Sequence, residues 1–148
     1  MIKEYQKIER KTFVAFILAL IFFCSSGRVA VSDEFLSPPK ESEAYKQYLR
    51  RPKSELSKIL YLIDRFKNTA FKIIYDGDEY DSNFATMTAR QFLAFNYRNE
   101  TAERWVKTHT YVSEPEGRVI HIKYPNGELR PARDVLLEEL EKLEHPHP

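Results

Sequence analysis

Two stretches of the chain, residues 71–81 and 119–133, repeat one order of strand, turn, strand and helix start. In each, apolar and polar residues alternate, which predicts a half-buried strand. The turns are expected at Asp76-Gly77 and Asn126-Gly127, since glycine accepts the positive φ that a two-residue hairpin turn requires. We therefore predict an α+β fold in which two short β-hairpins form a small antiparallel sheet packed by about four helices.

The alternation also assigns the two faces of this sheet. The residues expected to face inward are Phe71, Ile73, Tyr75, Ile120, Ile122 and Tyr124. His121 then lies on the polar face of its strand.

Apolar residues at helical spacing predict the helices around the sheet. These helices are expected at residues 54–68, 83–97, 102–110 and 131–143, with a short helical piece at 41–49. Ser54 is an N-cap residue, and Asp81 or Ser82 caps the helix that follows the first hairpin. In that helix Phe84, Met87, Phe95 and Tyr97 widen the apolar surface, so we expect it to pack on two sides.

Residues 1–30 resemble an export signal. Basic residues precede an apolar run at residues 13–24, and Ser25, Ser26 and Gly27 follow it. The run is shorter than the ~20 residues of a spanning helix. We expect either a cleaved signal peptide or an uncleaved N-terminal membrane anchor, with membrane contact only through residues 13–24. The protein is then periplasmic, or attached to the inner membrane.

The rest of the chain divides by composition. Residues 31–53, which contain Pro38-Pro39, read as a linker with a short helical segment, and residues 54–144 as a single domain. Residues 145–148 form a tail, where His145 and His147 are too few for a structural metal site.

Charge and cysteine content exclude several functions. Residues 1–30 hold five of the 23 basic and two of the 22 acidic side chains, so the remainder carries a net charge of about −2. That balance argues against nucleic-acid binding. The only cysteine, Cys24, lies in the export segment, so a mature domain has no disulfide. Phe22 and Phe23 precede Cys24, which fits poorly with lipid attachment, although lipidation stays an alternative.

The order of motifs resembles a family of small exported bacterial proteins of uncharacterised function. The segments that carry the resemblance are Phe71–Tyr80, Ala85 with Ala89, Thr101–Val106, Ser113–Gly117, Asn126-Gly127 and Val135-Leu136. There are three departures from the family pattern: Tyr75-Asp76 replaces an Arg-Asn, Gln91 replaces a His, and Val135 replaces a Trp. The resemblance implies export and the fold, and it implies no chemistry.

No residue pattern in the chain marks a catalytic or cofactor site, and we predict neither cofactor nor metal. His109 and His121 are the histidines available for acid–base chemistry, but no nucleophile or phosphate-binding motif accompanies them. The acidic loop from Asp76 to Asp81 does not match a calcium loop, and turn formation and helix capping explain it more simply.

The aromatic middle of the chain is the candidate binding surface, because a small domain cannot bury all of its aromatic side chains. The expected partner-binding residues are Trp105, Phe95, Tyr97 and Tyr111. The predicted function is a non-catalytic binding module of the bacterial envelope with a protein partner. The alternatives are a small enzyme that uses His109 or His121, and a weak ion-binding domain at Asp76–Asp81.

Overall fold

The computed structural model describes residues 35–145. The expected export segment with Cys24, and His147 in the tail, lie outside the described residues. The elements are η1 (Pro39–Glu41), α3 (Glu43–Arg50), α4 (Glu55–Arg65), β1 (Lys72–Tyr75), β2 (Asp78–Asp81), α5 (Ser82–Asn96), α6 (Ala102–His109), β3 (His121–Lys123), β4 (Leu129–Pro131) and α7 (Ala132–Glu144). This order confirms the α+β prediction.

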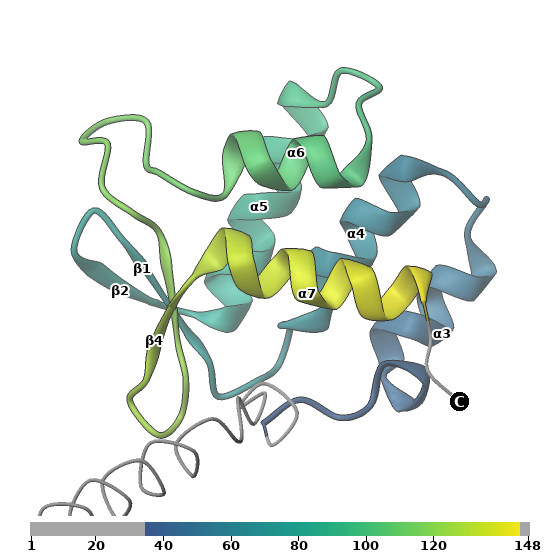
Figure 1. The fold of residues 1–148 in the computed structure, drawn as a ribbon, viewed down its shortest axis with the longest axis horizontal. Helices are drawn as coiled ribbons and strands as arrows, with labels where there is room; N and C mark the ends of the chain where they lie inside the picture. The colour runs from purple at the N-terminus through teal and green to yellow at the C-terminus, as the bar shows by residue number, and fades with distance from the viewer. Residues whose placement is uncertain (1–34, 146–148) are drawn as a thin grey trace, which may run out of the picture. The chain divides into compact units, whose positions relative to one another are not determined.

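The four strands form one antiparallel sheet in the order β2-β1-β3-β4. The two hairpins join where β1 pairs with β3, with Ile73 opposite Ile122. Figure 1 shows the hairpins on one side of the picture, with α3 and α4 on the other. The sheet predicted from the two repeated stretches is therefore present.

The two edges of the sheet differ in character. On the β2 edge, Asp78, Glu79 and Asp81 are exposed. The β4 edge is only three residues long and ends at Pro131, which has no backbone N–H.

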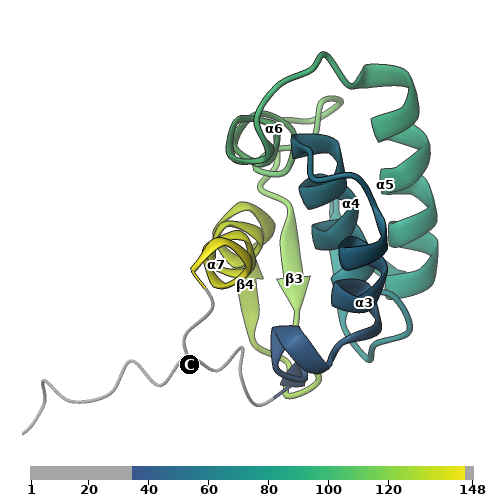
Figure 2. The ribbon, with the colours of Figure 1, turned by 90° about the vertical axis from the view of Figure 1, so that its right-hand side faces the viewer.

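Helix α4 lies at the centre of the helical layer and contacts α3, α5, α6 and α7 (Figure 2). Ser54 caps it by accepting a hydrogen bond of 3.2 Å from the backbone N–H of Ser57, as the sequence predicts. Ile59, Tyr61 and Leu62 are fully buried. Because α4 has neighbours on several sides, its burial extends beyond the single apolar stripe expected from its spacing.

A second cluster of buried residues joins the sheet to α7. The rings of Phe71 and Tyr124 meet edge to face at 4.9 Å, and Val135 of α7 is fully buried in the same cluster. Ile120, Ile122 and Tyr124 are buried while His121 and Lys123 are half-exposed, so the predicted faces are confirmed for residues 120–124. All four residues of β1 are half-buried, and Ile73 and Tyr75 pack against the same cluster.

The second hairpin turn differs from the expected two-residue form. Gly127 has a φ of +90° and donates its N–H to the carbonyl of Tyr124 at 2.8 Å, while the N–H of Tyr124 bonds to the carbonyl of Glu128. These bonds close a three-residue loop over residues 125–127. The reason is Pro125, because a two-residue turn at Asn126-Gly127 would make Pro125 and Glu128 the closing pair, and Pro125 has no N–H to donate to Glu128.

The segment expected to be a linker, residues 31–53, belongs to the folded unit where the structure describes it. Leu36 and Ala44 are buried, and α3 packs along α4. Ser42 caps α3 by accepting a hydrogen bond from the N–H of Tyr45 at 3.1 Å. Pro38-Pro39 interrupts the helices, as expected, but it does not detach the segment from the core.

Candidate functional site

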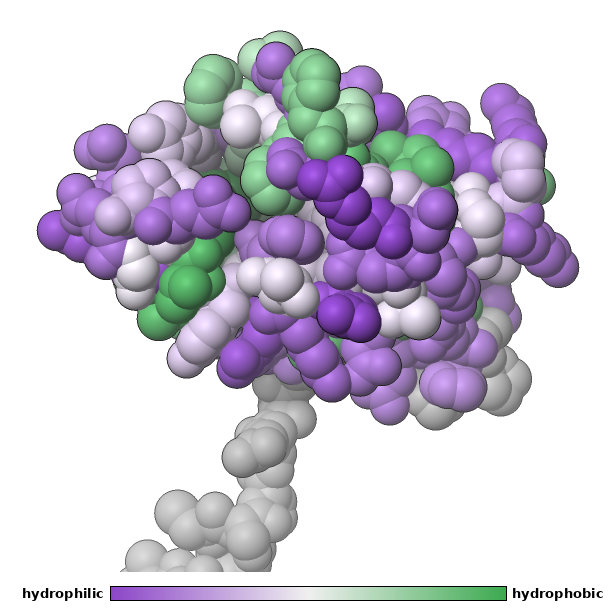
Figure 3. Space-filling model, turned by 90° about the horizontal axis from the view of Figure 1, so that it is seen from above, coloured by the Kyte–Doolittle hydropathy of each residue, from purple (hydrophilic) through white to green (hydrophobic). Residues whose placement is uncertain are grey.

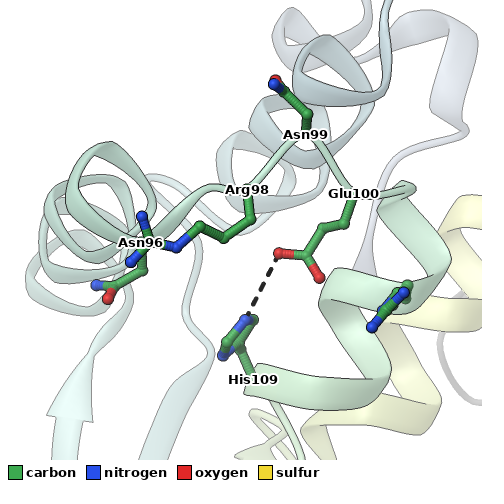
Figure 4. Close-up of a pocket in the computed structure, with 6 residues that line it drawn as sticks. Asn96, Arg98, Asn99, Glu100 and His109 are labelled. Carbon is green, nitrogen blue, oxygen red and sulfur yellow. Dashed lines mark ion pairs between the residues drawn. The ribbon is translucent and has the colours of Figure 1, made fainter.

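The polar pocket, as we name it, lies where the loop 97–101 joins α5 to α6. Two local features shape this loop. Asn99 adopts a left-handed φ of 57°, and Thr101 caps α6 by accepting a hydrogen bond of 3.2 Å from the N–H of Arg104. The cavity measures about 380 Å³ (Figure 4). Its lining residues are Asn96, Arg98, Asn99, Glu100, Arg104 and His109.

His109 and Glu100 face each other across this pocket (Figure 4). The Nε2 atom of His109 lies 3.7 Å from the carboxylate of Glu100, and the two side chains are 20% and 11% exposed. The imidazole is held between the rings of Phe92, at 5.3 Å, and Trp105, at 5.8 Å. The 3.7 Å separation exceeds hydrogen-bond length, so the Glu100 carboxylate keeps its lone pairs free.

Arg98 and Arg104 give the pocket its positive charge. Six other arginines of the described residues form ion pairs with carboxylates. Within residues 35–145 no carboxylate lies within 4 Å of either Arg98 or Arg104, although both are exposed. A guanidinium without a partner presents five N–H donors to an anion.

The chemistry of the pocket favours binding over reaction. Histidine beside a carboxylate is a common general base with its orienting group. However, the six lining residues include no hydroxyl or thiol that His109 could activate as a nucleophile. The pocket therefore offers charge and hydrogen bonds to a ligand.

A second feature, which we call the α5 outer face, comprises Phe84, Met87, Gln91 and Phe95. Phe84, Met87 and Phe95 are 46%, 59% and 74% exposed. Tyr80 of β2 extends this face, because its ring stacks on Phe84 at 5.4 Å. In Figure 3 apolar residues gather along the upper edge, the side of the molecule on which α5 lies.

The α5 outer face corrects the expectation that this helix packs on two sides. The opposite face of α5, with Thr86 and Leu93, is buried against the core. Figure 2 shows α5 at the side of the helical layer away from α7. None of the described elements covers its outer face, so the second apolar surface meets solvent.

The structure separates the four expected partner-binding residues. Trp105 is only 3% exposed and belongs to the core, so its assignment to a free surface was wrong. Tyr97 is half-buried against the same core, and Tyr111 is half-buried beneath the guanidinium of Arg133, 3.8 Å from the ring centroid. Phe95 alone of the four is largely exposed.

His121, the other candidate acid–base residue, does not line the polar pocket. It lies in β3 opposite Ile74 of β1 and Pro131 of β4. The two histidines are therefore not brought together, and only His109 has a carboxylate within 4 Å among the described residues.

Several acidic residues of the loop at Asp76–Asp81 form hydrogen bonds that stabilise the fold. Asp76 accepts a hydrogen bond from the hydroxyl of Ser113. The hydrogen bond from Lys123 lowers the pKa of Glu79, and that from the N–H of Phe84 lowers the pKa of Asp81, which caps α5. Across residues 35–145 no three His, Cys, Asp or Glu side chains are grouped to hold a metal ion.

Sequence reasoning missed most of the polar pocket. It selected His109, but the loop residues Arg98, Asn99 and Glu100 form no motif. The only sequence signal for these loop residues is Thr101 as a helix cap. A cap at this position predicts a tight turn before α6, with polar side chains close to the start of that helix.

Comparison of the chain with models of protein families, with curated proteins and with solved structures finds no match. Within residues 35–145 no helix is long and apolar enough to cross a membrane. The function must therefore be inferred from the residues themselves.

Proposed function

We propose that the protein is an exported component of the bacterial envelope that serves as a non-catalytic binding module. Its α5 outer face docks a helix of another envelope protein. The N-terminal pattern of basic residues, apolar run and small residues supports export, as does the resemblance to a family of exported proteins.

The observation that carries this proposal is the exposure of three large apolar side chains on one helix. Phe84 and Phe95 are eleven positions apart, which corresponds to about 16 Å along a helix. An apolar strip of this length matches about three turns of a partner helix. Aromatic residues and methionine are enriched at the centres of protein interfaces.

The charges at the N-terminal end of α5 specify the partner further. Asp81 is exposed at this end, where it caps α5, and Asp78 is exposed at the start of β2, on the same strand face as Tyr80. A complementary partner helix carries apolar residues along its middle and a basic side chain near these two carboxylates. Such charge complementarity sets the direction in which the helix docks.

The first experiment places a photo-crosslinking amino acid at Gln91, which is exposed in the middle of the α5 outer face. The control position is Glu103, an exposed residue of α6. In the host envelope we expect one protein to crosslink through Gln91 and not through Glu103. Equal crosslinking at the two positions would contradict the proposal.

The second step measures the affinity of the purified partner by calorimetry. The double variant Met87→Gln/Phe95→Gln should weaken binding at least about tenfold, because truncation of central interface residues commonly costs more than 1 kcal/mol. Leu129→Gln is the matched control, since Leu129 is 53% exposed on β4. The proposal fails if the double variant and the control bind equally well.

One observation favours the alternative of a small enzyme: the placement of Glu100 3.7 Å from His109 in a pocket. In that case His109 acts as a general base on water, with Glu100 as its orienting group. Turnover of an envelope peptide that is lost in His109→Gln, with the fold retained, would favour this alternative over the binding module.

A further inference from the structure

We infer that the polar pocket is a binding site for an acidic α-amino acid group, a ligand that carries one ammonium and two carboxylates. This inference is independent of the α5 outer face and of any protein partner. It rests on three properties of the lining residues: two guanidiniums without partners, one largely buried carboxylate without a donor, and a matching volume.

The cationic side of the pocket consists of Arg98 and Arg104. Within the described residues neither is paired with a carboxylate, and the two come from different elements, the loop 97–101 and α6. Arginine binds carboxylates with paired, charge-assisted hydrogen bonds. Two unpaired guanidiniums at one cavity are suited to the two carboxylates of one ligand.

The anionic side is Glu100. Its side chain is 11% exposed, and no described residue donates a hydrogen bond to its carboxylate. A carboxylate with so little exposure and no donor from the protein is stabilised when a cation or donor of a ligand reaches it. His109 is close but too distant for a hydrogen bond, so a ligand ammonium can occupy the free positions of Glu100.

The charge and the size of the pocket agree with this ligand. Arg98, Arg104 and Glu100 give the lining two positive charges and one negative charge, and an acidic amino acid carries the reverse. Asn96 and Asn99 also line the pocket, and in Figure 4 the Asn99 side chain points away from Glu100 and His109. A cavity of about 380 Å³ lies at the lower end of the range for small-molecule sites.

The test is a nuclear magnetic resonance titration of the purified chain with glutamate and with glutarate, which is glutamate without its amino group. We expect glutamate to shift the resonances of His109 and of its neighbour Trp105 and to bind at least about tenfold more tightly than glutarate. The dipeptide Glu-Ala, with its free N-terminus, distinguishes a free amino acid from the acidic end of a peptide as the natural source.

Variants assign the two halves of the site. Glu100→Gln should abolish the preference for glutamate over glutarate, while Arg98→Ala should weaken both ligands at least about tenfold. The matched controls are Glu103→Gln, an exposed glutamate of α6, and Arg50→Ala, an exposed arginine of α3. Both controls should bind as the unaltered chain does.

Three results would overturn the inference. They are glutarate that binds as tightly as glutamate, a Glu100→Gln variant that still prefers glutamate over glutarate, and the absence of a saturable shift with a 50-fold excess of glutamate, ~50 mM over ~1 mM protein. A failed titration would not count against the proposed docking of a partner at the α5 outer face, because crosslinking through Gln91 is measured without this ligand.

Discussion

Glu139 carries a carboxylate into the core of the described domain. It is 1% exposed, and it accepts a hydrogen bond of 2.7 Å from the Nε atom of Arg65, which is itself buried. Lys142 reaches its second oxygen at 3.2 Å. The ion pair thus joins α4 to α7 across a region that has little access to water.

Removing one member of this pair is our prediction for a single residue. Glu139→Ala leaves the Arg65 guanidinium buried without its partner, which typically lowers the free energy of unfolding by about 3–5 kcal/mol. Urea unfolding followed by circular dichroism measures the loss. The double variant Arg65→Met/Glu139→Leu should recover most of it, and a single variant as stable as the original chain would contradict the argument.

The site shows what a sequence reveals about single residues. His109 was noticed because histidine is the usual acid–base residue, but its neighbour Glu100 precedes it by nine positions in a turn and carries no signal. Trp105 was assigned to a surface because aromatics serve both cores and interfaces. Only the packing of α6 against α4 and α7 decides that Trp105 is buried.

Among the elements, the two hairpins contain turns of different geometry. At the first, Asp76 and Gly77 both have positive φ, of 53° and 92°. At the second, only Gly127 does, with Pro125 and Asn126 ahead of it. A Cβ at position 77 would lie 3.0 Å from the guanidinium of Arg118, whereas a Cβ at 127 would meet nothing within 4 Å.

We therefore predict that the two glycines respond differently to alanine. Both substitutions strain a positive φ and should destabilise by about 1–2 kcal/mol. Gly77→Ala should cost slightly more, because the Arg118 guanidinium must shift by a few tenths of an ångström, which weakens its 3.1 Å hydrogen bond to the carbonyl of Asp76. Thermal unfolding of the two variants side by side decides the order, and a larger loss for Gly127→Ala would refute it.

The elements themselves were largely predictable, because local signals determine them. Ser54 and Asp81 cap the helices where the sequence places them. Whether the second apolar face of α5 is covered depends on which other elements reach it, and the periodicity of one helix contains no such information. The same limit explains why residues 35–53 resembled a linker.

At the scale of the whole domain, the segment before α4 is tied to the core by charged groups. Arg51 donates a hydrogen bond of 2.9 Å to Asp64, and Arg65 donates one to the carbonyl of Ser37. Leu36 is buried in the cluster between the sheet and α7. These contacts connect the chain ahead of Ser54 to both clusters of the core.

Deleting this segment should therefore destabilise the domain. A chain that begins at Ser54 should have a free energy of unfolding at least about 2 kcal/mol below that of a chain that begins at Ser32, since burial of one leucine alone contributes 1.5–3 kcal/mol. Equilibrium unfolding in urea compares the two. Equal midpoints would show that residues 32–53 act as a linker after all.

The two edge strands, β2 and β4, affect how the protein should behave during purification. Any sheet edge with free backbone groups can recruit another copy, and natural proteins oppose this with charge or proline. Here three exposed carboxylates oppose the pairing of another strand with β2, and Pro131 opposes pairing with β4. Acid protonates the carboxylates of β2 but does not change Pro131. Protein that is acidified during purification should therefore form fibrils through β2, whereas protein kept at neutral pH should not aggregate.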